Sequence, residues 1–268
     1  MWTKELFGTN KPVIGMVHLL AMPTDSKYDP EGGMKKILER AKGDIIALVE
    51  GGIDGLLFCN EYSIPYTDKV RPVTIACMAR VIGELKAEIK VPFGVDVACD
   101  PYKVFDLAIA TDANFVRETL SGAYAGDYGI QNYNMGEIER HRVDVGCRNV
   151  YTLATLVPEG SRQIAERSIE EVAKTVTSSL NPSAFLVYGV AAGQPIDSSM
   201  ISRAKTATST PVFASNGVNA SSIEKTLSIA DGCVVGTWLK EDGKFYNKVD
   251  KNRVLELMKK AKEFRGDN

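Results

Sequence analysis

Short apolar runs alternate with helical segments along the whole chain, and this alternation constrains the fold more than any other feature. The runs are nearly continuous in apolar residues, which is typical of parallel strands buried on both faces. The predicted strands are Val13–Leu20, Gly55–Asn60, Pro92–Ala98, Phe115–Leu120, Asn149–Leu156, Ala184–Gly189, Pro211–Gly217 and Cys233–Leu239. Apolar spacing near 3.6 residues predicts helices over Met34–Glu50, Val70–Ile89, Tyr102–Ala110, Met135–Val145, Arg162–Leu180, Ile196–Thr208, Ala220–Ile229 and Val249–Phe264.

The number of strand–helix units distinguishes between the two common parallel α/β architectures. Doubly wound open sheets usually have about five to seven strands, whereas eight units in about 250 residues is the size of a (β/α)8 barrel. The chain has 268 residues and no linker rich in Pro, Gly or Ser. The sequence therefore predicts one α/β domain over residues 1–268, a single (β/α)8 TIM barrel.

Composition excludes several classes of protein. A net charge of -2 argues against a nucleic-acid-binding protein, which usually carries a basic surplus. The five cysteines are widely spaced, without a C-x-x-C motif or a zinc-like Cys/His cluster. The first residues are too charged for a secretory signal, and no apolar stretch approaches the length of a spanning helix. We expect reduced thiols, a cytoplasmic protein and no integral membrane association.

Titratable side chains stand at the ends of the first four predicted strands, which is where (β/α)8 barrels carry their function. His18, Glu61, Asp96 and Glu118 are the candidates for acid–base catalysis. Each has a structural alternative. His18 could be a core histidine, Glu61 could brace a loop or cap a helix, and Asp96 could belong to a salt bridge. Arg117 and Glu118 are adjacent, so both cannot face the barrel interior, and the sequence does not decide between them.

Asp96 interrupts an apolar run, and strand alternation places it on the same face as Gly94 and Ala98. Because glycine leaves space, we expect Asp96 to point inward near the barrel mouth, where uncompensated burial would raise its pKa. Residues 121–129 are rich in glycine and predict a long mobile loop over the site.

The last three strand ends are rich in glycine and small polar residues. Such turns let the backbone approach a ligand, and the loops after strands seven and eight of a barrel often bind phosphate. We expect the positive ends of the helix dipoles that follow these strands to favour an anion at the same place. The alternative is that these are simply tight turns. The candidate substrate- or phosphate-binding residues are Asn60, Arg117, Gly189, Gly193, Ser215, Asn216, Gly217, Gly236 and Thr237.

Several stretches together resemble the BtpA/SgcQ family, and its SgcQ-like branch in particular. They are PVIGMVHLLAMP, NEYSIPY, PFGVDV, FVRETLSGAYAGDYGI, YGVAAGQPID and SIADGCVVGTWLKEDGKFYNKVDKNRV. The resemblance covers about residues 4–265 and implies a ribulose-phosphate-binding-type barrel. BtpA proteins are named for photosystem I biogenesis, and SgcQ-like proteins are associated with sugar utilisation without an assigned reaction. The chain departs from the BtpA branch at the fifth predicted strand, where that branch is expected to have Lys-His after the apolar run and this chain reads Thr152-Leu-Ala-Thr155-Leu.

Three functions remain open at this stage. The first is a cofactor-free enzyme acting on a phosphorylated sugar or related small phosphate ester, by isomerisation, epimerisation, elimination, or hydrolysis or transfer at an anomeric carbon. A divalent metal held by Asp96, Glu61 and His18 is not excluded. The second is an assembly factor that uses the barrel as a scaffold, and the third is a sensor that binds without turnover. We expect a small phosphorylated substrate. We also expect a homo-oligomer, because barrels of this kind often form one.

Overall fold

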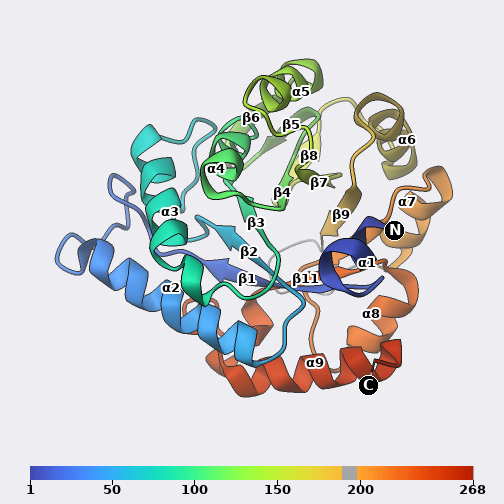
Figure 1. Cartoon of the computed structure of the whole chain (residues 1–268). Helices are drawn as coiled ribbons and strands as arrows, with labels where there is room; N and C mark the ends of the chain where they lie inside the picture. Colours follow the sequence, from blue (N-terminus) through green and yellow to red (C-terminus); the bar gives the residue numbers. More distant parts are fainter. Residues whose placement is uncertain (189–197, 268) are drawn as a thin grey trace.

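The protein forms a closed barrel of parallel strands in a computed structural model that describes residues 1–188 and 198–267 (Figure 1). The strands follow one another around the barrel in the order β1-β11-β10-β9-β7-β4-β3-β2. Their bounds are β1 Val13–His18, β2 Gly55–Cys59, β3 Phe93–Asp96, β4 Phe115–Glu118, β7 Tyr151–Thr155, β9 Ala184–Tyr188, β10 Val212–Ser215 and β11 Cys233–Val235. All eight predicted strands, and the (β/α)8 architecture, are confirmed.

Helices that follow the barrel strands form the outer ring in Figure 1. They are α2 Gly33–Glu50, α3 Pro72–Glu84, α4 Lys103–Thr111, α5 Met135–Asp144, α6 Ile169–Leu180, α7 Ser198–Ala207, α8 Ile223–Ile229 and α9 Lys251–Arg265, with 3-10 turns η1 Lys86–Glu88, η2 Thr237–Leu239 and η3 Glu241–Gly243. Helix α6 begins later than predicted because Ser168 and Glu171 form a capping box at its start. None of the helices in the described residues is long and apolar enough to cross a membrane.

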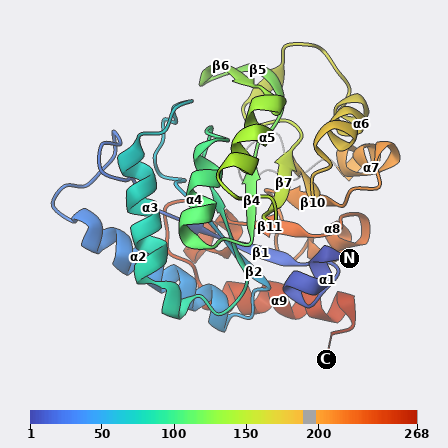
Figure 2. The same cartoon turned by 45° about the horizontal axis from the view of Figure 1, so that its top comes forward.

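A short helix that the sequence pattern did not predict, α1 (Trp2–Phe7), closes the N-terminal end of the barrel. Its side chains Trp2, Leu6 and Phe7 pack against the apolar cluster inside the barrel. Figure 2 shows α1 at the end of the barrel away from the β5–β6 hairpin. At six residues, α1 is too short for a recognisable helical repeat, and its apolar residues acquire their role only by packing on the strands.

The glycine-rich segment after β4 is a β-hairpin rather than the mobile loop expected from its composition. Strand β5 (Gly122–Gly126) pairs antiparallel with β6 (Gly129–Tyr133) and with β8 (Ser161–Gln163), which follows β7. Tyr124 anchors this small sheet because its ring is fully buried and its hydroxyl donates to the carbonyl of Leu156 at 3.0 Å. The segment therefore obtains its order from contacts that are remote in sequence.

Strand alternation separates two apolar layers. On β3, Val95 belongs to the cluster between barrel and helices, whereas Gly94 and Asp96 face the interior, as predicted. The reason why a glycine occupies position 94 differs from the predicted one. A Cβ on Gly94 would lie 2.3 Å from the Phe115 ring, so its space is already filled by that ring and does not accommodate Asp96.

Candidate functional site

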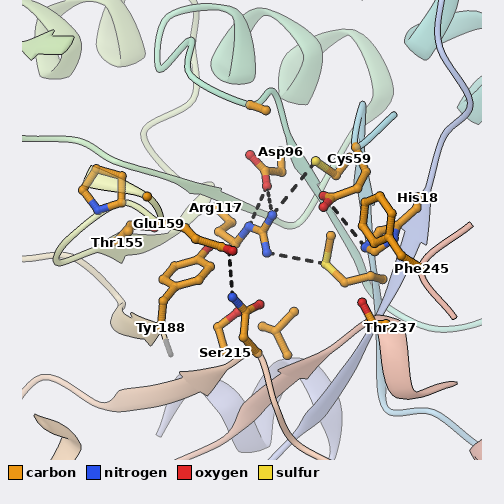
Figure 3. A pocket seen from close by; sticks show the side chains of 18 of the residues that line it. His18, Cys59, Asp96, Arg117, Thr155, Glu159, Tyr188, Ser215, Thr237 and Phe245 are labelled. Atoms are coloured by element: carbon orange, nitrogen blue, oxygen red, sulfur yellow. Dashed lines mark hydrogen bonds and ion pairs between the residues drawn. The ribbon is translucent and has the colours of Figure 1, made fainter. Parts of the chain in front are cut away.

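A cavity of about 540 Å³ opens at the C-terminal ends of the barrel strands (Figure 3). It brings together most of the residues selected from sequence, namely His18, Glu61, Asp96, Arg117, Glu118, Ser215, Asn216, Gly217, Gly236 and Thr237. Asn60 does not line it, because this buried side chain accepts a hydrogen bond from the N–H of Ala98 at 2.9 Å and braces the backbone instead. Gly189 and Gly193 lie outside the described residues.

An ion pair between Asp96 and Arg117 occupies the centre of the cavity wall (Figure 3). The Nε–H of Arg117 donates to Oδ2 of Asp96 at 2.6 Å, and Nη2 contacts the same oxygen. Burial raises the pKa of the Asp96 carboxyl, and the guanidinium opposes this effect. The Arg117 side chain also extends over the Tyr188 ring, 5.8 Å from its centroid. The salt-bridge alternative for Asp96 is therefore what the geometry shows.

The question of which of Arg117 and Glu118 faces the interior is settled by strand alternation. Phe115 belongs to the inner cluster and Val116 to the outer one, so Arg117 points inward and Glu118 starts from the outer face at the rim. Glu118 still reaches the cavity. Its Oε1 accepts from the N–H of Thr119 at 2.7 Å, whereas its buried Oε2 has no hydrogen-bond partner in the described part of the chain.

This environment changes the acidity of Glu118. Burial, and then the nearby Asp96, raise the pKa of Glu118 well above its usual range. The side chain therefore stays protonated at pH values at which an exposed glutamate is ionised. A carboxylic acid with one unpartnered oxygen next to a cavity is a competent proton donor.

Glu61 and His18 lie next to each other on a second side of the cavity. Oε2 of Glu61 is 3.9 Å from Nε2 of His18, and the Glu61 side chain is about 20% exposed. Burial raises the pKa of Glu61, and Arg117 opposes this shift. For His18, burial first, and then the cationic Lys240, Arg117 and Arg40, hold the pKa well below its usual value. His18 is therefore a neutral imidazole at physiological pH.

Behind His18 lies a buried lysine that the sequence analysis missed. Lys240 is fully buried, and its Nζ lies 2.8 Å from Nδ1 of His18 and 2.6 Å from the carbonyl of Phe245. It also donates to the Tyr62 hydroxyl. In sequence Lys240 stands in the stretch WLKED, which is typical of a solvated turn. Local sequence therefore carries no sign that this lysine contacts a residue on β1.

The third side of the cavity is formed by the turns after β10 and β11. Asn216 and Gly217 have positive φ angles of 72° and 64°, and no oxygen in the described residues accepts a hydrogen bond from the N–H groups of Asn216, Gly217, Gly236 or Thr237. We call these four N–H groups the amide cluster. Unpartnered backbone donors beside a cavity suit an anion.

The helix dipoles expected to assist this cluster are not arranged as predicted. Strand β11 is followed by the 3-10 turn η2, and α8 begins only at Ile223. The backbone N–H groups just before α8 are not available to an anion. Those of Ser221 and Ser222 already donate to Oδ1 of Asn219. Any anion at this place is therefore bound by turn amides rather than by the start of an α-helix.

One carboxylate reaches the edge of the amide cluster. Oε2 of Glu159, in the loop between β7 and β8, accepts from Nδ2 of Asn216 at 2.9 Å (Figure 3). Because Glu159 is exposed, it can turn away at little cost when another anion arrives. Metal binding has no comparable support. Within the described residues, no group of three or more His, Cys, Asp or Glu side chains is arranged to hold a metal ion.

The comparisons with known proteins agree with this architecture. A thiamine phosphate pyrophosphorylase from Pyrococcus furiosus shares the fold with a TM-score of 0.58 at 16% identity, over 95% of this chain and 96% of that one. The putative sgc region protein SgcQ of Escherichia coli is 45% identical over 98% of this chain and 99% of its own length. The photosystem I biogenesis protein BtpA of Synechocystis is 29% identical over 93% and 88%, respectively.

The profile of the BtpA family matches residues 9–263, which is nearly the whole chain. This range contains every strand of the barrel and every described residue of the cavity wall. The chain belongs to the BtpA family.

Proposed function

We propose that this protein is an enzyme that acts on a phosphorylated sugar or a related small phosphate ester. The observation that carries the proposal is the composition of one cavity. It combines an anion-binding amide cluster after β10 and β11 with the titratable groups His18, Glu61 and Glu118. Its volume of about 540 Å³ lies in the range of small-molecule sites.

The position of the amide cluster supports a phosphate as the anion. In (β/α)8 barrels, the loops after the seventh and eighth strands frequently form a phosphate site. Here these loops contribute Asn216, Gly217, Gly236 and Thr237. The structural neighbour from Pyrococcus furiosus is named for a phosphate compound, and it shares the fold over most of both chains. A phosphate bound here would fix the remainder of the substrate against the carboxyl groups.

The carboxyl groups can supply proton transfer in both directions. Glu61 is partly exposed next to His18 and can accept a proton as a carboxylate, whereas Glu118 keeps its proton and can donate it. Arg117, which is paired with Asp96, lines the same cavity. A base and an acid on different sides of a sugar phosphate are what isomerisation or epimerisation requires. Elimination, or hydrolysis at an anomeric carbon, could use the same groups.

An assembly role is the second candidate, and one surface feature favours it. On the sheet β5–β6–β8, Ile130 is 72% exposed and Ile164, just after β8, is 54% exposed. One relative is named as a photosystem I biogenesis protein. A protein that serves only as a scaffold has no use for a ligand in the cavity, so ligand binding distinguishes the two candidates.

The proposal is tested by thermal unfolding in the presence of inorganic phosphate and a panel of sugar phosphates, with Asn216→Asp as the site variant. A ligand at 100 times its Kd should stabilise the protein by about 2.7 kcal/mol, which is about 5–10 °C for a chain of this size. Asn216→Asp is nearly isosteric and brings a negative charge to the amide cluster. It should weaken phosphate binding at least about tenfold, or ~1.4 kcal/mol.

Asn132→Asp is the matched control, because Asn132 is exposed on β6 and lies outside the cavity lining. It should respond to phosphate like the unmodified protein. The proposal fails if no phosphorylated compound stabilises the protein, or if the two variants respond alike. A compound that stabilises but is never converted, as followed by NMR of the compound, would indicate a sensor.

A further inference from the structure

Lys240 presents three donors to three different partners in a place without solvent. An ammonium group carries three protons and no acceptor. The carbonyl of Phe245 can only accept. The hydroxyl of Tyr62 donates its own proton to that same carbonyl, so its oxygen is free to accept from Lys240. The third proton of Lys240 therefore points at Nδ1 of His18.

This contact determines the position of the proton on the imidazole. Nδ1 can accept from an ammonium only when it carries no proton, so a neutral His18 must carry its proton on Nε2. Burial, and then Arg40, lower the pKa of Lys240 to about 8, so it is still an ammonium at pH 7. The ring edge that carries Nε2 faces the amide cluster, since a Cβ on Gly236 would lie 3.0 Å from Nε2.

The charged groups around His18 disfavour a second proton on the ring. Lys240 approaches from the segment after β11, Arg117 from β4 and Arg40 from α2, and Glu61 after β2 is the carboxylate on the opposite side. The Tyr62 ring packs edge-on at 6.0 Å. Arg117 is paired with Asp96 and Arg40 with Asp44, so Lys240, which contacts Nδ1 directly, is the main cation that disfavours a second proton. Glu61 is not within hydrogen-bonding distance of Nε2.

We propose that Lys240 is a positioning residue that fixes His18 as a neutral hydrogen-bond donor, with its Nε2–H directed at an acceptor oxygen of the ligand beside the amide cluster. His18 then does not serve as the base, which leaves that role to Glu61. The assignment of the ligand oxygen rests on the proposed function. In a sugar phosphate, it would be the carbonyl or hydroxyl oxygen that gains negative charge during proton transfer. The position of the proton on His18 does not depend on that function.

The proton can be located by long-range 1H–15N NMR of the unmodified protein between pH 6 and 7, below the pKa of Lys240. The chain has two histidines, and His141 is bonded through Nε2 to Asp106, so His141→Gln assigns the His18 signals. We expect a neutral His18, protonated at Nε2, that does not titrate across this range. In Lys240→Met, Nδ1 loses its donor, and His18 should populate both neutral forms. Tyr62→Phe keeps the Lys240–His18 contact and should keep the Nε2–H form.

A proton on Nδ1 in the unmodified protein, or an imidazolium forming with an ordinary pKa, would overturn the proposal even if Lys240→Met failed to fold. So would an unchanged His18 in folded Lys240→Met. The ligand part uses 2-phosphoglycolate, which joins a phosphate to acceptor oxygens, with inorganic phosphate for comparison. We expect the Nε2–H signal to shift more with 2-phosphoglycolate. Binding without such a shift refutes the subsite. Absence of binding by every phosphorylated compound refutes the proposed function while leaving the imidazole assignment standing.

Discussion

The two ends of the barrel are formed by the same eight strands, and each buries an ion pair, Asp54–Arg265 at the N-terminal end and Asp96–Arg117 at the C-terminal end. They differ in what surrounds the pair. At the N-terminal end, α1 stacks Trp2 on Tyr151, with ring centroids 4.6 Å apart, and the indole N–H donates to the carbonyl of Ser183 at 2.8 Å. At the C-terminal end, the barrel buries the Asp96–Arg117 pair, the imidazole of His18, the ammonium group of Lys240 and the carboxyl group of Glu118, whose pKa burial raises well above its usual range.

The difference between the two ends indicates where the fold tolerates buried polar atoms that lack a hydrogen-bond partner. At the N-terminal end the indole N–H of Trp2 has a partner, Asp54 accepts from Val13 and Arg265, and Nε of Arg265 lies 2.6 Å from Asp267, whereas Oε2 of Glu118 at the mouth has no partner in the described residues. Buried polar atoms without partners are uncommon and concentrate at functional sites. In (β/α)8 barrels the N-terminal face serves stability and the C-terminal face serves chemistry.

The largest loss of unfolding free energy is expected from Asp96→Asn. Such a loss would show that a residue at the C-terminal mouth also stabilises the fold, which the simple division between the two ends does not predict. Removing one member of a buried ion pair leaves Arg117 as an unpaired charge, which costs about 3–5 kcal/mol. Urea denaturation should show this loss of unfolding free energy. The double variant Asp96→Asn/Arg117→Met removes both charges and should lose less. An unchanged denaturation midpoint for Asp96→Asn would mean that the pair does not stabilise the fold.

A smaller loss is expected at the other end from Trp2→Ala. The variant loses the stacking on Tyr151 and one hydrogen bond, and because Trp2 is only partly buried we expect a cost of about 2 kcal/mol rather than the full value for a core tryptophan. Trp2→Phe keeps a ring and should lose about 1 kcal/mol. Neither change should alter stabilisation by phosphate. A loss of ligand response in Trp2→Ala would show that the two ends are coupled.

The smallest effect, of opposite sign, is expected from Glu118→Gln. Because the folded-state pKa of Glu118 is raised, the unfolded chain releases this proton first. The unmodified protein therefore loses stability as the pH rises from about 4.5 through the folded-state pKa. Glu118→Gln removes that loss and should be more stable at pH 7, by about 1 kcal/mol. Melting curves between pH 4 and 8 measure the difference. Lower stability than the unmodified protein across this range would argue against a protonated Glu118.

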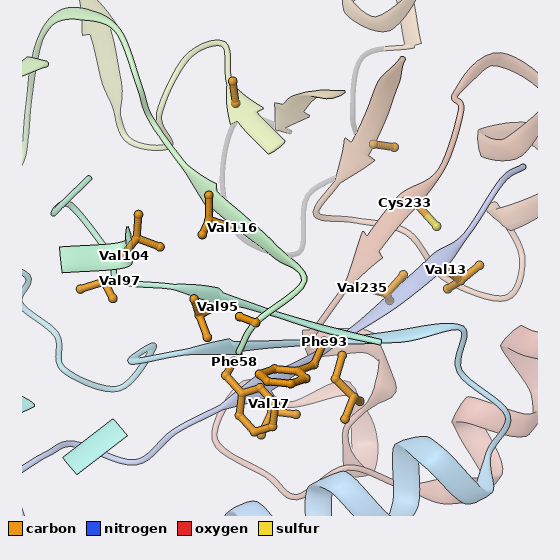
Figure 4. Packing of buried hydrophobic residues seen from close by; sticks show 14 of the residues in the cluster. Val13, Val17, Phe58, Phe93, Val95, Val97, Val104, Val116, Cys233 and Val235 are labelled. Atoms are coloured by element: carbon orange, nitrogen blue, oxygen red, sulfur yellow. The ribbon is translucent and has the colours of Figure 1, made fainter. Parts of the chain in front are cut away.

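The fold was largely predictable because apolar periodicity is a local property. Figure 4 shows the valines and aromatics of the outer layer, such as Val17, Phe58 and Val95, which alternate with inward-facing residues along their strands. What the pattern missed were elements too short or too rich in glycine to show a period. Helix α1 and the β5–β6 hairpin acquire their order from packing on the barrel.

Which residues line the cavity was largely predictable, whereas the contacts between them were not. Strand ends selected His18, Glu61 and the turn at Asn216, which do line one cavity. The pairing of Asp96 with Arg117 could not be predicted. It depends on the register of β3 and β4, in which Val95 lies opposite Val116, and a register is set by two strands together.

The sequence by itself determined that this chain forms a (β/α)8 barrel and that polar side chains gather at the C-terminal ends of its strands, because both follow from the local order of apolar and polar residues. Only the tertiary structure decided which of these groups are charged and which keep their protons. His18 and Lys240 are 222 positions apart, yet their contact fixes the state of the imidazole. The protonation of a buried group depends on its burial and its neighbours, and both exist only once the barrel has closed.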